Sequence, residues 1–243
     1  MSFFAACEKS SREFLQEIGN FTHEELTECV AVGEGGDISI RADLLAEEIF
    51  VRNLSKFGRI YSEESGYIGE GEHIIYLDPL DGSDNFASGI PYYGASVCLD
   101  EKTNKKSFIC NFANGDMFYK DKDSEFGINL FSGANIIQKN RQNKVGIFER
   151  AYANSGIAMA IFKSGIKFRS PGALALSLIY SRGCSFTLFV GKLRVFDIIA
   201  ALEFLDGHFI YEKDDILLVS QDKKIFEEIL EIVTLTKGNQ NVL

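Results

Sequence analysis

The chain has 243 residues, of which 46% are hydrophobic and 25% are charged, and its formal net charge at pH 7 is −10. This composition predicts a globular protein with a substantial core, arranged as one large domain or two smaller ones. The negative charge argues against general binding to nucleic-acid backbones or anionic membranes, because like charges repel over roughly 10 Å at moderate salt. No apolar run reaches the roughly 18 residues that a membrane-spanning helix needs.

Helical spacing of apolar residues predicts two amphipathic helices in the N-terminal part, within residues 3–21 and 44–54. Between them, the sequence Gly-Glu-Gly-Gly-Asp at 33–37 is expected to form a flexible loop. Farther along, short β-rich runs separated by turn-forming groups predict an antiparallel meander. The strands of this meander are expected at 59–62, 73–78, 93–100, 106–113 and 116–120.

After a polar stretch at 138–144, the pattern changes to alternating strands and helices. A domain boundary is therefore expected near residue 140, dividing the chain into an N-terminal α+β half (1–140) and a C-terminal α/β half (141–243). In the C-terminal half the expected strands are 145–148, 185–190 and 216–220, and the expected helices are 151–163, 174–180, 195–205 and 225–233.

The five cysteines are scattered and form no Cys-x-x-Cys pair, which fits neither a disulfide framework nor a zinc site. They are expected to be buried thiols in a reducing environment. The N-terminal residues include no basic leader, and their apolar stretch is too short for a signal sequence. A cytoplasmic protein is therefore expected.

Residues 78–86, Asp-Pro-Leu-Asp-Gly-Ser-Asp-Asn-Phe, hold two carboxylates three positions apart at the end of a predicted strand. The ends of strands are where α/β proteins usually place their chemistry. Further acidic segments lie at element boundaries, at 36–43, 62–65 and 196–201. Clustered Asp and Glu without His or Cys favour Mg²⁺ or Mn²⁺ over zinc, because these hard cations prefer oxygen ligands.

Each acidic segment also has a purely structural interpretation. Asp-Pro-Leu-Asp-Gly at 78–82 is a plausible turn, and Glu63 with Glu64 is a plausible solvated pair. Asp43 and Asp197, which begin helical patterns, are plausible helix caps. The functional interpretation therefore depends on the set of segments and on no single one.

Together, the segments resemble a family of lithium-sensitive, metal-dependent phosphatases that includes inositol monophosphatase, fructose-1,6-bisphosphatase and 3′(2′),5′-bisphosphate nucleotidase. The family's Asp-Pro-(Ile/Leu)-Asp-Gly-(Thr/Ser)-x-Asn-Phe signature is met at 78–86, and its Glu-Glu-Ser at 63–65. Its Gly-Asp loop is met at 36–43, and its Trp-Asp-x-Ala-Ala motif loosely at 196–200, where Phe196 replaces tryptophan. The resemblance covers most of the chain and implies a layered α/β/α/β/α sandwich, usually dimeric.

The resemblance also implies a site for two or three Mg²⁺ ions, with Mn²⁺ as an alternative. It makes metal ligands of Glu63, Asp78, Asp81 and Asp197, together with the backbone carbonyl of Leu80. It assigns Asp43 and the Ser83 hydroxyl to orient and deprotonate a metal-bound water, so the catalytic set is Asp43, Ser83 and Glu63. The implied reaction is in-line attack of that water on phosphorus.

For the substrate, the resemblance implies phosphate binding by backbone N–H groups at Gly82 and Ser83, and sugar contacts from the backbone of Gly172 and Ala173. Val190 stands where animal inositol monophosphatases have a glutamate that contacts inositol, which puts inositol selectivity in doubt. The Lys192-Leu193-Arg194 run resembles archaeal-type enzymes that accept both inositol phosphate and fructose 1,6-bisphosphate. Arg194 is thus a candidate for binding a second phosphate, the alternative being that it faces solvent.

The sequence therefore predicts a Mg²⁺-dependent phosphatase acting on a small phosphorylated sugar, polyol or nucleotide, as a homodimer without membrane association. Fructose bisphosphatase and bisphosphate nucleotidase are alternatives within the class. A regulatory binding protein that retains the fold is the alternative from another class.

Overall fold

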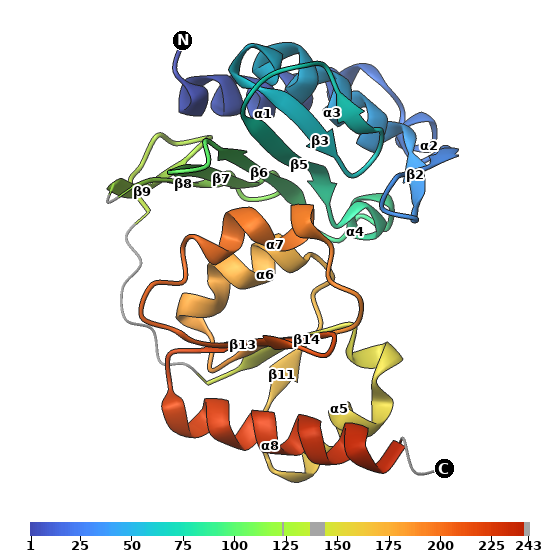
Figure 1. Ribbon diagram of the computed structural model, residues 1–243. Helices are drawn as coiled ribbons and strands as arrows, with labels where there is room; N and C mark the ends of the chain where they lie inside the picture. The colour runs from blue at the N-terminus through green and yellow to red at the C-terminus, as the bar shows by residue number, and fades with distance from the viewer. Residues whose placement is uncertain (123, 137–143, 241–243) are drawn as a thin grey trace. The chain divides into compact units, whose positions relative to one another are not determined.

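The computed structural model describes residues 1–122, 124–136 and 144–240. The chain forms two compact units: Met1–Ile137 with Arg194–Phe204, and Gln138–Leu193 with Leu205–Leu243 (Figure 1). The expected boundary near residue 140 lies outside the described residues, so the division into 1–140 and 141–243 stays a prediction. What the structure adds is that Arg194–Phe204, late in the sequence, belongs to the first unit.

The first unit is built on a seven-stranded sheet of order β4-β3-β5-β6-β7-β8-β9. From β5 to β8 the neighbouring strands are antiparallel, which confirms the predicted meander there, and β9 adds a further antiparallel strand that was not predicted. The strands are β3 (Arg59–Ser62), β4 (Gly66–Ile68), β5 (Ile74–Asp81), β6 (Gly94–Asp100), β7 (Lys105–Asn111), β8 (Asp116–Asp121) and β9 (Ser124–Asn129).

The antiparallel prediction is wrong for β3 and β5, which run parallel. The reason is β4, which forms a hairpin with the outer side of β3. The chain then crosses back and enters β5 on the other side of β3, in the same direction as β3. Consequently, the carboxyl ends of β3 and β5 lie at the same edge of the sheet.

Helices cover both faces of this sheet. Helices α1 (Phe3–Glu17) and α3 (Arg41–Leu54) pack together on the face to which Ala95, Val97 and Leu99 of β6 belong. Helix α7 (Val195–Leu202) packs on the opposite face of β5, β6 and β7, where Ser96 donates a hydrogen bond of 3.2 Å to the Phe196 carbonyl. This alternation along β6 is the period of two expected of a strand buried on both sides.

Shorter elements complete the first unit. Strands β1 (Cys29–Val32) and β2 (Ile38–Ile40) form a hairpin, so the glycine-rich segment predicted as a loop is its turn. Helix α4 (Ser83–Ala87) directly follows β5, and its N-cap is Gly82 at φ +87°. The remaining helical elements are α2 (His23–Leu26), η1 (Ile18–Asn20) and η2 (Ser55–Phe57).

The second unit has a five-stranded sheet of order β11-β10-β12-β14-β13. Strand β10 is parallel to β11 and β12, whereas β14 is antiparallel to both of its neighbours. The strands are β10 (Gly146–Glu149), β11 (Phe168–Arg169), β12 (Thr187–Val190), β13 (Phe209–Lys213) and β14 (Ile216–Ser220).

In the second unit, α5 (Ser155–Lys163) and α8 (Lys223–Gln240) pack together, and their apolar residues share a core with Leu188 of β12. Helix α6 (Leu174–Ile179) packs against β10 and β12 on the other face, where the Thr187 hydroxyl donates to the Ser177 carbonyl. The other short helices are η3 (Ala151–Ala153) and η4 (Tyr180–Gly183). Among the described residues, no helix combines the length and apolar character needed to cross a bilayer.

Candidate metal centre

Three carboxylates of the first unit converge. One oxygen each of Glu63, Asp78 and Asp197 lies within 4.8 Å of the others. Glu63 follows β3, and its N–H donates to the Leu77 carbonyl of β5 at 3.0 Å, so the parallel pairing sets Glu63 beside Asp78. Asp197 comes from the first turn of α7, whose Phe196 packs on Tyr61 with ring centroids 5.5 Å apart.

The end of β5 is irregular. Its pairing with β6 shifts between Asp78 and Asp81, and the Leu80 N–H donates to Asp78 Oδ1 at 3.1 Å. Residues 78–81 are therefore an irregular last part of strand β5 and not a separate turn. Asp81 is 8% exposed, and its charge contributes to raising the pKa of both Glu63 and Asp78, so it belongs to the same electrostatic cluster. The roles of Asp81 and of the Leu80 carbonyl as ligands stay predictions.

The carboxylates of the cluster are held away from water. Asp78 and Asp197 are 2% and 4% exposed, and the Glu63 side chain 12%. Burial, followed by the charge of Asp197, raises the pKa of Glu63 to about 8. Burial and then the charge of Glu63 raise the pKa of Asp78 well above its usual value. Buried carboxylates facing one another are costly unless a cation lies between them, and an all-oxygen donor set suits Mg²⁺ or Mn²⁺.

Arg194 supplies a positive charge at this cluster. Its Nη1 lies 2.6 Å from Glu63 Oε1 and 2.6 Å from Asp37 Oδ2. Its Nε and Nη2 donate to the two oxygens of Asp197 at 2.9 and 3.1 Å. The side chain is 25% exposed. Arg194 therefore pairs with carboxylates. The two sequence interpretations, binding of a second phosphate and exposure to solvent, did not include such partners.

Asp43 and Ser83 occupy the starts of two helices. Asp43 is 2% exposed and accepts a 2.7 Å hydrogen bond from the Ile40 N–H, as a helix-capping residue does. Burial, with smaller contributions from Glu64 and Asp84, raises the pKa of Asp43 to about 8. Ser83 is the first residue of α4. The capping interpretation of Asp43 is therefore confirmed, while the catalytic roles of both residues stay predictions.

A supporting network that the sequence analysis missed ties α3 to the turn after β3. Glu47, 7% exposed, accepts hydrogen bonds from the N–H and hydroxyl of Ser65, at 3.1 and 2.6 Å. The Ser39 hydroxyl donates to Glu64. Glu47 lies four positions after Asp43, hence on the same helix face, and that spacing is the signal that could have found it.

The predicted sugar contacts lie in the second unit. Gly172 has a φ of +93°. Its N–H donates to Glu149 Oε2 at 2.9 Å, and the Ser177 hydroxyl donates to the other oxygen of Glu149. The Ala173 N–H also bonds to this carboxylate. Glu149 is 2% exposed and was not predicted to be important. It holds the loop that contains Gly172 and Ala173 in a fixed conformation.

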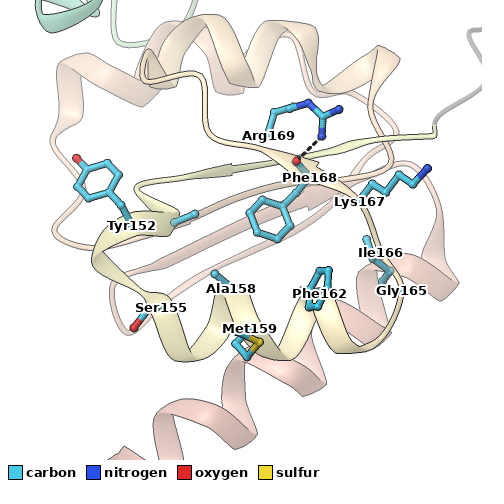
Figure 2. Close-up of a pocket in the computed structure, with 11 residues that line it drawn as sticks. Tyr152, Ser155, Ala158, Met159, Phe162, Gly165, Ile166, Lys167, Phe168 and Arg169 are labelled. Carbon is cyan, nitrogen blue, oxygen red and sulfur yellow. Dashed lines mark hydrogen bonds between the residues drawn. The ribbon is translucent and has the colours of Figure 1, made fainter.

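The second unit also has an open cavity of about 720 Å³ between α5 and β11 (Figure 2). Exposed apolar side chains line it, among them Tyr152, Met159 and Phe162. None of the described residues that line it carries a carboxylate, so its chemistry differs from that of the predicted site.

The chain is similar to proteins of one family. The model of a family described as "Inositol monophosphatase family" matches residues 4–156. A relative from Archaeoglobus fulgidus named fructose-1,6-bisphosphatase/inositol-1-monophosphatase is 27% identical, over 91% of this chain and 94% of the relative. A fructose-1,6-bisphosphatase from Pyrococcus furiosus is 30% identical, over 62% of this chain and 59% of its own.

The fold is also that of solved structures. One titled inositol monophosphatase-fructose 1,6 bisphosphatase superposes with a TM-score of 0.77 at 20% identity, over 96% of this chain and all of the other. This likeness confirms the predicted layered α+β fold of inositol monophosphatase type.

Proposed function

Because the chain belongs to the inositol monophosphatase family, whose members are metal-dependent phosphatases, we propose that it hydrolyses a sugar or polyol phosphate monoester with Mg²⁺. The observation that carries this proposal is the convergence of Glu63, Asp78 and Asp197 within 4.8 Å. Asp81 and the Leu80 carbonyl complete the proposed ligand set for two or three ions. When bound, the metal supplies Lewis-acid chemistry that lowers the pKa of water and stabilises charge on the leaving oxygen.

The chain's own residues supply the remaining functions. Asp43, with its pKa raised to about 8, is suited to accept a proton from the attacking water near neutral pH. The Ser83 hydroxyl orients that water in this proposal, and the Gly82 and Ser83 N–H groups hold the phosphate at the start of α4. Glu149 binds the N–H groups of Gly172 and Ala173, so other backbone groups of these two residues make the proposed contact with the sugar.

Fructose 1,6-bisphosphate and inositol phosphate are the favoured substrates. The named activities of the Archaeoglobus relative support this choice, whereas valine at position 190, where an inositol-contacting glutamate is missing, argues against selectivity for inositol. A bisphosphate nucleotide is the alternative. A cytoplasmic homodimer belongs to the same proposal, and size-exclusion chromatography with light scattering tests the dimer.

A substrate panel tests the function. Phosphate release from inositol 1-phosphate, fructose 1,6-bisphosphate and 3′-phosphoadenosine 5′-phosphate is measured side by side with Mg²⁺ and with Mn²⁺. We expect turnover of at least one of the first two. A folded protein that hydrolyses none of the three with either metal contradicts the proposal and favours a regulatory role for the fold.

A further inference from the structure

The guanidinium of Arg194 contacts two of the carboxylates that the proposed metal needs. Both oxygens of Asp197 accept hydrogen bonds from it, at 2.9 and 3.1 Å, and Glu63 Oε1 lies 2.6 Å from its Nη1. Two of the three converging carboxylates are therefore already paired with a cation that belongs to the chain.

The position of Arg194 is fixed from several sides. Asp37, at the end of the β1–β2 turn, contacts its Nη1 at 2.6 Å. The Gly35 N–H donates to the Glu63 carbonyl at 2.9 Å, and a Cβ at Gly35 would lie 3.0 Å from Arg194 Nη1. The turn thus packs directly against the Arg194–Glu63 pair. Arg194 also immediately precedes α7, so the helix that carries Asp197 carries the arginine with it.

Two cations near the same carboxylates repel each other. A guanidinium hydrogen-bonded to Asp197 and a divalent ion bound to the same carboxylate lie a few ångströms apart, in a region partly shielded from water. Because the arginine is always protonated, it cannot avoid this repulsion by losing its charge. This repulsion lowers the affinity of the site for metal.

We propose that Arg194 competes with the divalent cation for the carboxylates. Its guanidinium pairs with Glu63 and Asp197 and thereby weakens metal binding there. This inference rests on the proposed metal site. Arg194 sets the metal concentration at which the site fills, and a bound ion displaces its guanidinium from at least one of the two carboxylates. The displaced guanidinium is then available to an anionic substrate.

Metal affinity tests the proposal without reference to activity. Mn²⁺ binding to the whole chain is measured by electron paramagnetic resonance and by calorimetry, at one pH and ionic strength, for the wild type and Arg194→Gln. We expect Arg194→Gln to bind Mn²⁺ at least about tenfold more tightly, which corresponds to about 1.4 kcal/mol. Unchanged or weaker binding overturns the proposal.

Two further variants keep the test sharp. Lys105→Gln removes one positive charge from the same unit, where Lys105 pairs with Glu203 at 3.1 Å, and its Mn²⁺ affinity is expected to match the wild type. An equal gain in Lys105→Gln overturns the specific role of Arg194. Arg194→Lys keeps the charge without the forked donors, so its gain is expected to be smaller than that of Arg194→Gln. If neither the wild type nor Asp78→Asn binds Mn²⁺, the proposed metal site itself is wrong.

Discussion

Both units bury acidic side chains, but the partners of these carboxylates differ between the units. In the second unit, Glu149 stands alone and its carboxylate accepts hydrogen bonds from Gly172, Ala173 and Ser177. In the first unit, Glu63, Asp78 and Asp197 face one another, with Arg194 as the cation that contacts Glu63 and Asp197. These hydrogen bonds satisfy Glu149, whereas the carboxylates of the cluster repel one another and need a cation between them. Burial of a carboxylate alone therefore does not indicate a metal site, but mutual repulsion among several does.

The largest expected effect comes from Asp78→Asn. This change keeps the shape of the side chain but removes a charged ligand, so phosphate release should fall by roughly a thousandfold or more. Because it also relieves repulsion, the variant should unfold in EDTA at the same temperature as the wild type or a higher one. Phosphate release and thermal melts measure the two effects, and full activity would contradict the assignment. Asp81→Asn should likewise abolish phosphate release with little loss of folding.

Saturating Mg²⁺ should stabilise the first unit. At about a hundredfold excess over the dissociation constant, the free energy of unfolding should rise by about 2.7 kcal/mol, which shifts the melting temperature by roughly 5–10 °C. Differential scanning calorimetry across a Mg²⁺ titration measures this shift. Asp78→Asn should lose most of it, and an unchanged wild-type melt would count against a preformed site.

Glu149→Gln tests the other half of the comparison. It weakens the charged acceptor for the Gly172 N–H and the Ser177 hydroxyl, so the free energy of unfolding should fall by about 1–3 kcal/mol. Urea denaturation measures this loss. The Mn²⁺ affinity should stay that of the wild type, and a large drop in that affinity would remove the distinction between the two acidic regions.

Another expected effect is a dependence of stability on pH. The pKa of Glu63 and of Asp43 is raised to about 8 in the folded chain, so between about pH 4.5 and 8 the folded state holds protons that the unfolded state has lost. The free energy of unfolding in EDTA should therefore fall as pH rises through this range, by at most about 1.4 kcal/mol per pH unit for each such proton. Denaturation at a series of pH values measures the slope. Saturating Mg²⁺ should reduce it, and a stability that rises with pH would refute the assignment.

Much of the site could be predicted from local sequence. Asp78 and Asp81 lie in the last part of strand β5, whose β-branched character is visible, and Glu63 directly follows strand β3. Their convergence with Asp197 could be expected only from the family motifs. The parallel pairing of β3 and β5, which brings Glu63 beside Asp78, is a tertiary feature. In the sequence β4 lies between these two strands, whereas in the sheet β4 pairs with the other side of β3.

Other features had weak or missing local signals. Strand β9 is short, half of it is exposed, and it contains Gly127, so it shows no clear alternation. Strand β13 begins Phe209-Ile210-Tyr211, a signal that could have been recognised. The partners of Glu149 are 23 and 28 residues away, and Asp37 is 157 residues from Arg194. Spacing rules do not reach such distances, so these contacts required the folded chain.

The placement of Arg194–Phe204 in the first unit has a consequence for biosynthesis. A nascent chain that has emerged only to residue 140 lacks α7, so the Ser96 side of its sheet is uncovered and Asp197 does not yet exist. The first unit can be completed only after about sixty further residues have left the ribosome. During this interval one face of the N-terminal sheet is exposed, and exposed apolar surface of this kind favours aggregation and chaperone binding.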